Sequence, residues 1–348
     1  MIEVDMVTRR DVAQLAGTSE AMVSYVLNDG PRGVAPATRA RIVAAIKELG
    51  YRPNAVARSL KTSRTMTLGL VVPDNSNPFF AELARAIEDV AFEAGYVLLL
   101  GNAVDNDERE AAYIRILIDR QVDGLIVAPA HGAGSWVTEL SGTAVPRLVL
   151  DREIELPGAS HVLVDNAGGA YTATKHLLEH GFTRIGCISG LAGMHPTVER
   201  VAGWRRALAD AGQGPQDGML VHAAFGRAHG YRAGRELLAG ADRPEALFVA
   251  SDEQALGVLR AAAELGLRVP QDLAICAFDG IEGSAYTVPA LTTMRQPFES
   301  LGRSAVEWLL AKIADPALAP SRITHATTLV ARGSCGCPDP LGGDSAIG

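Results

Sequence analysis

Two short helical patterns joined by small residues stand near the start of the chain, within residues 8–28. The first segment is expected from Arg9 to Ala16, and the second continues to about Leu27. Apolar residues recur in both at helical spacing: Val12, Leu15 and Ala16, then Val23, Val26 and Leu27. Ala13 and Gly17 are small and allow the two segments to approach closely. This layout predicts a helix-turn-helix, whose second helix fits the major groove of DNA.

Capping residues mark the ends of these helices. Thr8 is expected to cap the first helix, with Asp11 three residues later completing a capping box, and Ser19 can cap the second. A third helix is expected from Pro36 to Gly50, where Ala35 is a poor N-cap. Its buried face is expected to consist of Ile42, Ala45, Ile46 and Leu49. Three helices in about fifty residues form only a small core.

Charge is unevenly distributed along the chain. The net charge of −8 is unusual for a DNA-binding protein. However, residues 1–64 contain ten Lys and Arg against six Asp and Glu, a balance of +4, and the remainder contains 22 against 34, a balance of −12. A basic head on an acidic body directs phosphate contact to one end of the molecule. An imbalance of this size in a short segment can also arise by chance.

From residue 67 onward, short apolar runs alternate with helical patterns. The expected strands are Leu68–Val72, Val97–Leu100, Gly124–Val127, Leu148–Leu150, Val162–Val164, Ile185–Ile188, Leu247–Ala250 and Leu273–Phe278. The expected helices are Phe80–Ala94, Glu108–Arg120, Ala170–Gly181, Val201–Ala211, Gly230–Leu238 and Asp252–Leu265. This alternation predicts an α/β body with parallel, doubly wound sheets. About 265 residues is large for one sheet, so two lobes are expected, with ligands bound at the carboxyl ends of the strands.

The head and the body together resemble one known family, the LacI/GalR bacterial repressors. In the head the resemblance rests on Val12-Ala13, Ala16-Gly17-Thr18-Ser19, Val23-Ser24, Val26-Leu27-Asn28, Tyr51, Pro53-Asn54, Ala57 and Leu60. In the body it rests on Asp151-Arg152, Val164-Asp165-Asn166, Arg200, Gly203-Trp204, Ala250-Ser251-Asp252, Phe278-Asp279, Leu291-Thr292-Thr293 and Gln296. The resemblance implies a repressor whose body has the periplasmic-binding-protein fold and whose operator affinity depends on a small molecule, usually a sugar, a nucleoside or a related metabolite. It also implies these domains: 1–53 as the helix-turn-helix head, 54–64 as a hinge helix and linker, 65–333 as the effector domain, and 334–348 as a flexible tail. Lobe 1 is expected to comprise about 65–164 and 298–325, and lobe 2 about 165–297 and 326–333.

The resemblance assigns DNA contacts to the second helix and its surroundings. Glu20 can accept from cytosine N4, and Ala21 can contact a thymine methyl group. Tyr25 stands where the family usually has Arg, which leaves the operator sequence open; Ser24 and Thr18 are expected to bind phosphates. The expected DNA-contacting residues of the head are Thr8, Thr18, Ser19, Glu20, Ala21, Ser24, Tyr25 and Asn28. Outside this motif, Glu20 and Tyr25 would be read as solvated helix surface.

Residues 54–60 resemble the hinge helix of the family. A helix this short is unstable alone, but two copies can fold together over DNA. Ala57 is small enough for close packing of that pair, Asn54 lies at its start, and Leu60 is expected to wedge into the minor groove. The alternative is that Leu60 is buried against the body. Two heads on two half-sites require a homodimer, and the operator is expected to be a pseudo-palindromic duplex.

A small-molecule site is expected between the lobes. Residues 74–80 follow the first strand of the body, where Asn75 can bind hydroxyls and Phe79 or Phe80 can stack on a sugar ring, only one of the two facing the cleft. Arg200 is the expected polar anchor because its guanidinium suits vicinal hydroxyls. The remaining expected contacts are Asp151, Phe225, Ser251, Asp279 and Gln296. Capping or an interlobe ion pair is the alternative role for Asp151, Asp252 and Asp279.

The four cysteines give no metal centre that sequence alone can assign. Cys187 and Cys276 lie in apolar runs and are expected to be buried thiols. Cys335 and Cys337 form a Cys-x-Cys pair for which a metal or redox role stays open, but a zinc site needs four ligands and no second pair lies nearby. We therefore expect no metal and no cofactor.

Two other classes of protein compete with this interpretation. An enzyme is disfavoured because the chain lacks a Gly-x-Gly-x-x-Gly motif after a strand, a P-loop, a Gly-x-Ser-x-Gly elbow and a His-Glu-x-x-His pattern. A sugar-binding transport protein is disfavoured by the helix-turn-helix and by the acidic start of the chain, Met1-Ile2-Glu3-Val4-Asp5, which lacks a secretion signal. With no apolar stretch long enough to span a bilayer, we expect no membrane partner and a cytoplasmic protein.

Overall fold

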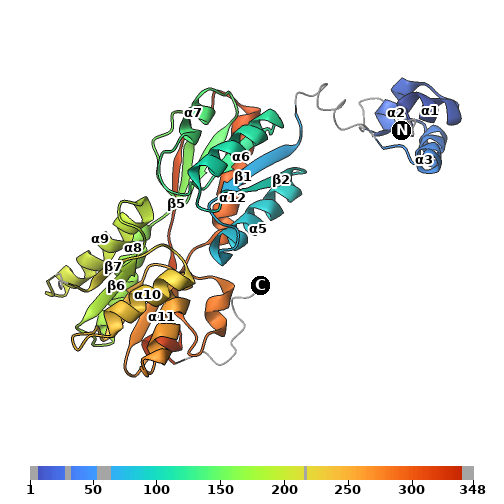
Figure 1. Cartoon of the computed structure of the whole chain (residues 1–348). Helices are drawn as coiled ribbons and strands as arrows, with labels where there is room; N and C mark the ends of the chain where they lie inside the picture. Colours follow the sequence, from blue (N-terminus) through green and yellow to red (C-terminus); the bar gives the residue numbers. More distant parts are fainter. Residues whose placement is uncertain (1–6, 28–32, 53–63, 215–217, 339–348) are drawn as a thin grey trace, which may run out of the picture. The chain divides into compact units, whose positions relative to one another are not determined.

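The computed structural model describes residues 7–27, 33–52, 64–214 and 218–338 (Figure 1). The chain divides into two compact units, Met1–Thr65 and Met66–Gly348. The predicted hinge residues Asn54, Ala57 and Leu60 lie outside the described residues, as does Asn28.

The described residues of the first unit form three helices, α1 (Arg9–Leu15), α2 (Glu20–Leu27) and α3 (Pro36–Leu49). Thr8 caps α1 through a capping box with Asp11, because the Thr8 backbone N–H donates to Asp11 Oδ2 at 2.7 Å and the Thr8 side chain accepts from the Asp11 backbone. Gly17 adopts φ +58 in the turn, a left-handed conformation that favours glycine. The helix-turn-helix expected from the sequence is therefore present.

A small core holds these helices together. Its fully buried members include Val12 and Val23, with Ile42 from α3. The prediction for Leu15 is wrong, because 47% of this residue is exposed while Ala13 and Ala16 are buried. The contact face of α1 is thus formed by small residues, which lets α2 approach closely.

The second unit contains two six-stranded sheets, one in each lobe. The sheet of lobe 1 has the order β11-β5-β4-β3-β1-β2, and its adjacent strands are all parallel. Its strands are β1 (Thr67–Val72), β2 (Val97–Asn102), β3 (Gly124–Val127), β4 (Arg147–Leu150), β5 (Ser160–Val164) and β11 (Arg322–His325). Helices α5 (Pro78–Glu93) and α12 (Phe298–Ala314) cover one face, and α6 (Asp107–Asp119) and α7 (Trp136–Ser141) cover the other. Both faces are buried, which explains why the strands read as nearly continuous apolar runs.

The sheet of lobe 2 has the order β12-β10-β9-β8-β6-β7, and only the β10–β12 pair is antiparallel. Its strands are β6 (Ile185–Ser189), β7 (Leu220–His222), β8 (Ala246–Val249), β9 (Ala274–Asp279), β10 (Thr292–Arg295) and β12 (Thr328–Val330). Helices α8 (Asn166–Glu179) and α9 (His195–Asp210) pack on one face, and α10 (Arg227–Leu238) and α11 (Asp252–Glu264) on the other. Two 3-10 helices follow, η1 (Glu282–Tyr286) and η2 (Gly333–Cys335). The chain passes between the lobes after β5, after β10 and after β11.

The structure differs from the sequence analysis at the carboxyl end of the chain. We expected a flexible tail from residue 334, yet Ser334 and Cys335 are fully buried. The Ser334 hydroxyl donates to Ile275 O at 2.7 Å and accepts from the Thr292 backbone N–H at 2.8 Å. These bonds fix η2 against β9 and β10, so the segment through Pro338 belongs to the fold.

Among the described residues, no helix combines the length and the apolar character needed to cross a membrane.

Candidate functional site

The start of α2 forms the polar surface of the first unit. Glu20 and Ala21 are exposed, while Ser24 and Tyr25 are partly buried one turn later on the same helix. Thr18 and Ser19 precede this helix, and the Met22 backbone N–H donates to Ser19 Oγ at 3.4 Å, in agreement with a capping role. Thr8 lies at the start of α1. The structure thus places the predicted contacts on α2 and its N-terminal turn, apart from Thr8 and the undescribed Asn28.

Helices α1 and α3 carry exposed basic side chains. Exposed Arg and Lys residues occur at Arg9, Arg10, Arg39, Arg41 and Lys47. Asp11 is the one acidic residue of α1, and hydrogen bonds from Thr8 lower the pKa of its carboxyl group. Since Asp11 is engaged in the cap, the cationic groups dominate the solvent face, which suits contact with phosphates.

A cavity of about 300 Å³ opens in the second unit, lined by residues from both lobes. It lies at the carboxyl ends of the strands, as expected for a parallel sheet. Seven of the nine predicted effector contacts line it: Phe79, Phe80, Asp151, Arg200, Phe225, Ser251 and Asp279.

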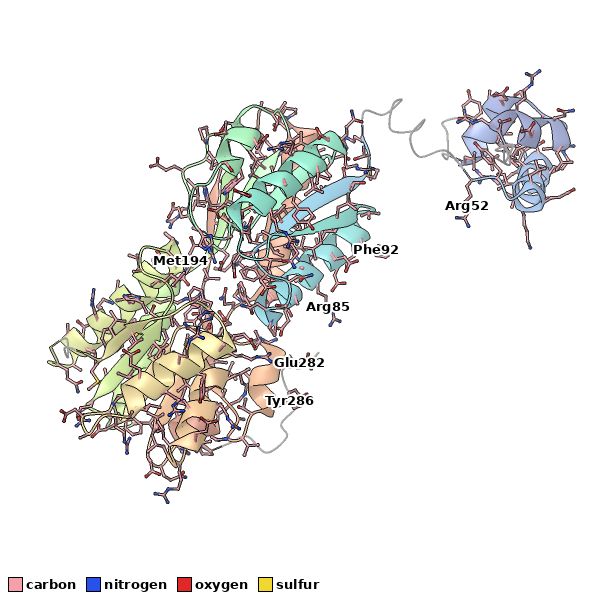
Figure 2. All side chains as sticks on the ribbon, viewed as in Figure 1. Arg52, Arg85, Phe92, Met194, Glu282 and Tyr286 are labelled. Atoms are coloured by element: carbon pink, nitrogen blue, oxygen red, sulfur yellow. The ribbon has the colours of Figure 1, made fainter. Side chains whose placement is uncertain are left out.

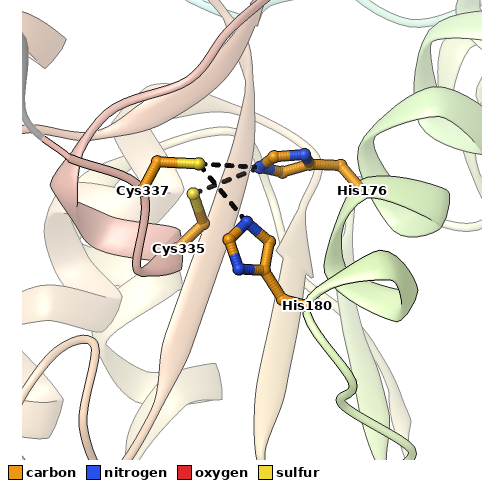
Figure 3. Close-up of side chains that lie close together, drawn as sticks. All are labelled: His176, His180, Cys335 and Cys337. Atoms are coloured by element: carbon orange, nitrogen blue, oxygen red, sulfur yellow. Dashed lines mark hydrogen bonds between the residues drawn. The ribbon is translucent and has the colours of Figure 1, made fainter.

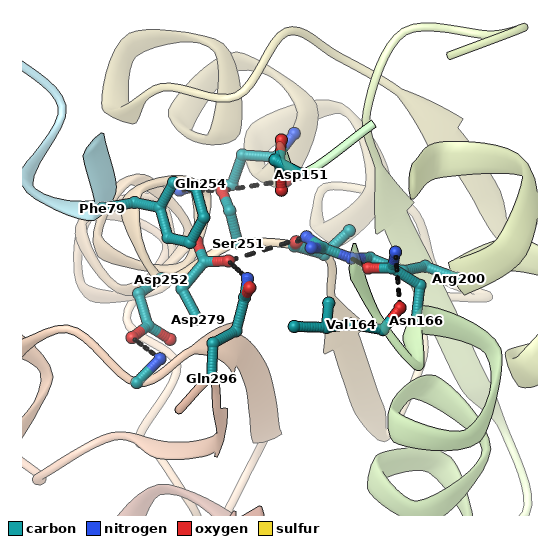
Figure 4. Close-up of polar contacts among 12 residues, drawn as sticks. Phe79, Asp151, Val164, Asn166, Arg200, Ser251, Asp252, Gln254, Asp279 and Gln296 are labelled. Carbon is teal, nitrogen blue, oxygen red and sulfur yellow. Dashed lines mark hydrogen bonds and ion pairs between the residues drawn. The ribbon is translucent and has the colours of Figure 1, made fainter. Parts of the chain in front are cut away.

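Arg200 is the central cation of this cavity (Figure 4). It is 3% exposed, and its Nε donates to Asn166 Oδ1 at 2.8 Å, while its Nη1 donates to the carbonyl of Ala250. The guanidinium carbon lies 3.8 Å from the centre of the Phe278 ring and 5.7 Å from that of Phe225. Burial lowers the pKa of this guanidinium, but arginine stays charged in proteins. Arg200 is therefore a fixed, oriented cation between aromatic rings.

Asp279 is the anionic partner of Arg200. Its Oδ1 lies 3.7 Å from Arg200 Nη1 and accepts a hydrogen bond of 2.9 Å from Gln296 Nε2. Burial raises the pKa of the Asp279 carboxyl, and the Arg200 guanidinium opposes this shift. Its backbone has φ +122, and Asp151 and Asp105, which also line the cavity, have φ +68 and +48. Left-handed backbone at three lining acids is costly and is typical of binding sites, where the fold holds side chains in place.

Asp252 and Ser251 serve mainly to brace the lobe 2 side of the cavity. Asp252 is fully buried and accepts from the backbone N–H groups of Gly280 and Ile281 at 2.8 and 2.9 Å and from the Thr293 hydroxyl at 2.6 Å. Burial raises the pKa of Asp252 to about 7. Ser251 caps α11, because Gln254 N donates to its Oγ at 3.1 Å. Asp252 thus braces lobe 2 from within, a role different from the capping or interlobe ion pair that the sequence left as alternatives, and it is not among the residues that line the cavity.

Aromatic rings form the apolar part of the wall. Phe79 and Phe80 pack edge to face at 4.9 Å, and Phe79 lies 5.6 Å from Phe298. Both lining rings are also about 95% buried in the core. The expectation that only one of them faces the cleft is therefore wrong, because Phe79 and Phe80 both line the cavity and both pack in the core.

Two predicted contacts do not line the cavity. Asn75 is exposed beside it and pairs with Asn102, whose Nδ2 donates to Asn75 Oδ1 at 2.8 Å. Gln296 lies behind Asp279 and orients that carboxyl group. Both corrections have the same cause: sequence position identifies the strand end but not the direction of the side chain.

Several lining residues were missed. They are Asp105, Ala130, His131, Arg152, Leu191, Met194, Pro196, Ala224, Gly226 and His229, whereas Asp74 and Asn77 belong to the segment 74–80 that the sequence already placed at the site. The rule that ligands meet the carboxyl ends of strands could have found those that follow a predicted strand, but Ala224, Gly226 and His229 follow β7, which the sequence did not predict. Arg152 in particular lies next to a predicted residue and donates to the carbonyl of Ala130.

Comparisons with known proteins agree for both units. Residues 8–54 match the family model "Bacterial regulatory proteins, lacI family", and residues 174–335 match "Periplasmic binding protein-like domain". The chain is 39% identical to the HTH-type transcriptional repressor PurR of Erwinia tasmaniensis, covering 94% of this chain and 97% of that protein. It is 38% identical to the ribose operon repressor of Escherichia coli K12, covering 94% and 100%. Its structure is similar to that of the lac repressor dimer bound to operator and the anti-inducer ONPF, with a TM-score of 0.84, 28% identity and coverage of 95% and 99%.

Proposed function

This chain belongs to the lacI family of bacterial regulatory proteins, and we propose that it is a repressor whose operator affinity is set by a neutral carbohydrate bound between its two lobes. The observation that carries this proposal is the cavity itself. It offers the guanidinium groups of Arg152 and Arg200, several carboxylates and aromatic faces in a single space of about 300 Å³, a volume suited to a small ligand.

The charges of the lining favour an uncharged ligand. Arg152 and Arg200 stand against four acids, namely Asp74, Asp105, Asp151 and Asp279. A phosphorylated sugar would place two further negative charges among these acids, whereas the hydroxyls of a neutral sugar can donate to the carboxylates and accept from Arg200. The rings of Phe79 and Phe225 can stack on the apolar face of such a sugar. A ribose-like or hexose-like ring therefore fits this chemistry.

Coupling to DNA requires two arrangements of the lobes. One contact that crosses between them is the hydrogen bond of 2.8 Å from the backbone N–H of Glu282 in η1 to Glu82 Oε1 on α5. A ligand changes operator affinity only as far as it binds the two arrangements with different affinity. We propose that closure of the lobes alters the spacing of two heads in a dimer and so folds or unfolds the hinge helices at residues 54–60.

The same hinge would hold the operator. Leu60 is proposed to insert between base steps at the centre of a pseudo-palindrome, with Asn54 and Ala57 in the paired helices. Glu20, Ala21 and Tyr25 of α2 would contact base edges or phosphates in each half-site. Because these contacts require DNA in the same compartment, we propose a cytoplasmic location and a regulatory rather than an enzymatic role.

A homodimer is proposed from the apolar edge of lobe 1. Strand β2 is at the edge of its sheet and exposes Val97, Leu99 and Leu100, while Phe92 on α5 is 78% exposed and points outward (Figure 2). An uncovered apolar edge strand is a pairing surface. The variant Leu100→Lys should therefore shift the molar mass in solution from dimer to monomer, whereas the control Val198→Lys on α9 should not. A monomeric wild-type protein would contradict this assignment.

The proposal is tested by operator binding. The purified full chain is titrated onto labelled DNA from upstream of its own gene, and a thermal-shift screen of neutral sugars, sugar phosphates and nucleosides identifies the ligand. A ligand at 100 times its Kd should add about 2.7 kcal/mol to the stability of the state that binds it. Binding to that DNA with a Kd that changes on ligand addition supports the proposal. A transport protein or an enzyme would not retard the DNA at physiological salt, and a preference for sugar phosphates would overturn the choice of a neutral ligand.

A further inference from the structure

Four metal-binding side chains meet at the end of α8, on lobe 2 (Figure 3). His176 lies in the last turn of α8 and His180 is the C-cap residue of that helix, while Cys335 and Cys337 come from the segment that follows β12. The possible ligand atoms of all four lie within 4.8 Å of one another. The two pairs are about 160 residues apart in sequence, so the fold, not local sequence, assembles this cluster.

Each pair is shaped by the backbone that carries it. His176 and His180 are four residues apart on one helix, a spacing that places both imidazoles on the same face. Gly336 adopts φ +97, which turns the chain between the two cysteines so that both sulfurs face the helix. The bonds of Ser334 to β9 and β10 hold this turn in position. The cluster is thus preformed by α8 on one side and by η2 on the other.

The distances match those between ligands of a tetrahedral metal. Cys335 Sγ lies 3.2 Å from His176 Nε2, and Cys337 Sγ lies 3.7 Å from His176 Nε2 and 3.3 Å from His180 Nε2. With Zn–S near 2.3 Å and Zn–N near 2.0 Å, a tetrahedron places sulfur and nitrogen about 3.6 Å apart. A small shift of these side chains would therefore accommodate an ion at their centre.

We propose that His176, His180, Cys335 and Cys337 bind one structural Zn²⁺ ion. Two thiolates and two neutral imidazoles are a donor set that zinc prefers, and four protein ligands close the site to substrate. The His-x3-His spacing is typical of zinc sites, and Cys-x-Cys is one residue tighter than most. The Thr292 hydroxyl lies 3.1 Å from Cys335 Sγ, where it can donate to a bound thiolate. This proposal revises our expectation that the chain has no metal.

The site would join the end of the chain to a helix that supports the effector cavity. Cys335 is buried, but His180 is exposed and Cys337 partly so, which gives an ion a path from solvent. Helix α8 begins at Asn166, whose side chain accepts from Arg200 at 2.8 Å. Zinc would therefore stabilise lobe 2 without touching the ligand.

The test measures metal in the full chain, purified without a polyhistidine tag from zinc-supplemented cells. Elemental analysis should find one zinc per chain. In protein stripped by a chelator and reloaded with Co²⁺, the visible spectrum should show intense tetrahedral bands with a thiolate charge-transfer band. Cys337→Ser and His180→Gln, both changes at accessible side chains, should lower zinc affinity by at least about 100-fold. The control Cys187→Ala removes a thiol of β6 and should leave zinc content at the wild-type value.

Stability gives a second readout. Chelation should lower the Tm of the wild-type body, whereas Cys337→Ser should have a lower Tm already and should not respond to the chelator. The proposal is overturned by a wild-type chain that carries no zinc after reduction and reloading, by an octahedral Co²⁺ spectrum, or by zinc content that Cys337→Ser and His180→Gln leave unchanged. A Cys335–Cys337 disulfide that persists in freshly purified protein and prevents loading would also overturn it.

Discussion

Glu110 on α6 is a fully buried acid beside the effector cavity, and its replacement by Gln should make the protein more stable at neutral pH. Glu110 Oε1 accepts from the backbone N–H of Ala130 at 2.8 Å, whereas its buried Oε2 has no partner among the described residues. Burial raises the pKa of Glu110 from its ordinary value of 4.5 to about 7, and the nearby Asp107 adds to the shift while Arg152 opposes it. An uncharged side chain of the same shape avoids this burial cost.

The direction in which the stability of the wild type changes with pH follows from the protonation of Glu110 in the folded and the unfolded chain. Below about pH 4.5, Glu110 is protonated in both the folded and the unfolded chain. In this range the wild type and Glu110→Gln should therefore differ little in their free energy of unfolding. Between pH 4.5 and about 7 the unfolded chain loses the proton first, so the free energy of unfolding of the wild type falls as pH rises. The difference between the two pKa values, at about 1.4 kcal/mol per pH unit, amounts to roughly 3 kcal/mol at most. This loss is complete above pH 7.

Calorimetry of the wild type and Glu110→Gln between pH 4 and 8 measures this difference. The Tm of the body should diverge with rising pH, and at pH 8 the variant should be the more stable by up to roughly 3 kcal/mol. Other buried acids such as Asp252 and Asp279 contribute equally to both proteins and cancel in the comparison. Curves that run parallel over the whole range would refute the reasoning, since they would mean that Glu110 ionises alike in folded and unfolded chains.

Three further predictions concern ligand, packing and DNA. Phe225→Ala should raise the Kd for the effector about tenfold by removing a stacking ring, with operator affinity of the free protein unchanged. Calorimetric titration should show no such loss for Tyr286→Ala, a control at an exposed aromatic residue outside the cavity lining. Gly203→Ala should lower the free energy of unfolding by about 1–3 kcal/mol, because a Cβ on Gly203 would meet the carbonyl of Ala167 and would lie 2.8 Å from the Tyr171 backbone N. Denaturant unfolding should show this loss for Gly203→Ala but not for the exposed control Ala202→Ser. Equal stability of the two variants would count against the close packing of α8 and α9. Leu60→Ala should weaken operator binding more than non-specific binding, and the affinity of both proteins should fall steeply with salt; equal losses on both DNAs, or a flat salt response, would speak against the wedge and the phosphate contacts.

Much of the fold could be predicted from the sequence because buried parallel strands are apolar along their whole length. Strand β3 was predicted with its observed bounds, and β1, β6 and β9 within one or two residues. Strands at the sheet edges, such as β11 and β12, are only four and three residues long and contain exposed and partly buried residues, which is too short for a recognisable pattern. They are defined by pairing with distant strands, and local sequence carries no such information.

The candidate site residues likewise comprise some that the sequence could predict and others that only the fold reveals. Asp279 could be predicted because it directly follows an apolar strand, and Arg200 because the resemblance and the donors of its guanidinium pointed to it. Asn75 and Gln296 could not be separated from the true lining, since that depends on which way a side chain turns. The sequence drew attention to Cys335 and Cys337 but not to His176 and His180, because only the fold brings the two histidines to the cysteine pair.

The central claim is that a ligand held between the lobes changes the affinity of the head for its operator. Fluorescence anisotropy with the full chain, its upstream DNA and saturating ligand tests this claim directly. The account predicts that the Kd for operator changes by about 5-fold to 150-fold, the usual range of coupling between two sites. An operator Kd that stays the same with every ligand that stabilises the body would contradict it.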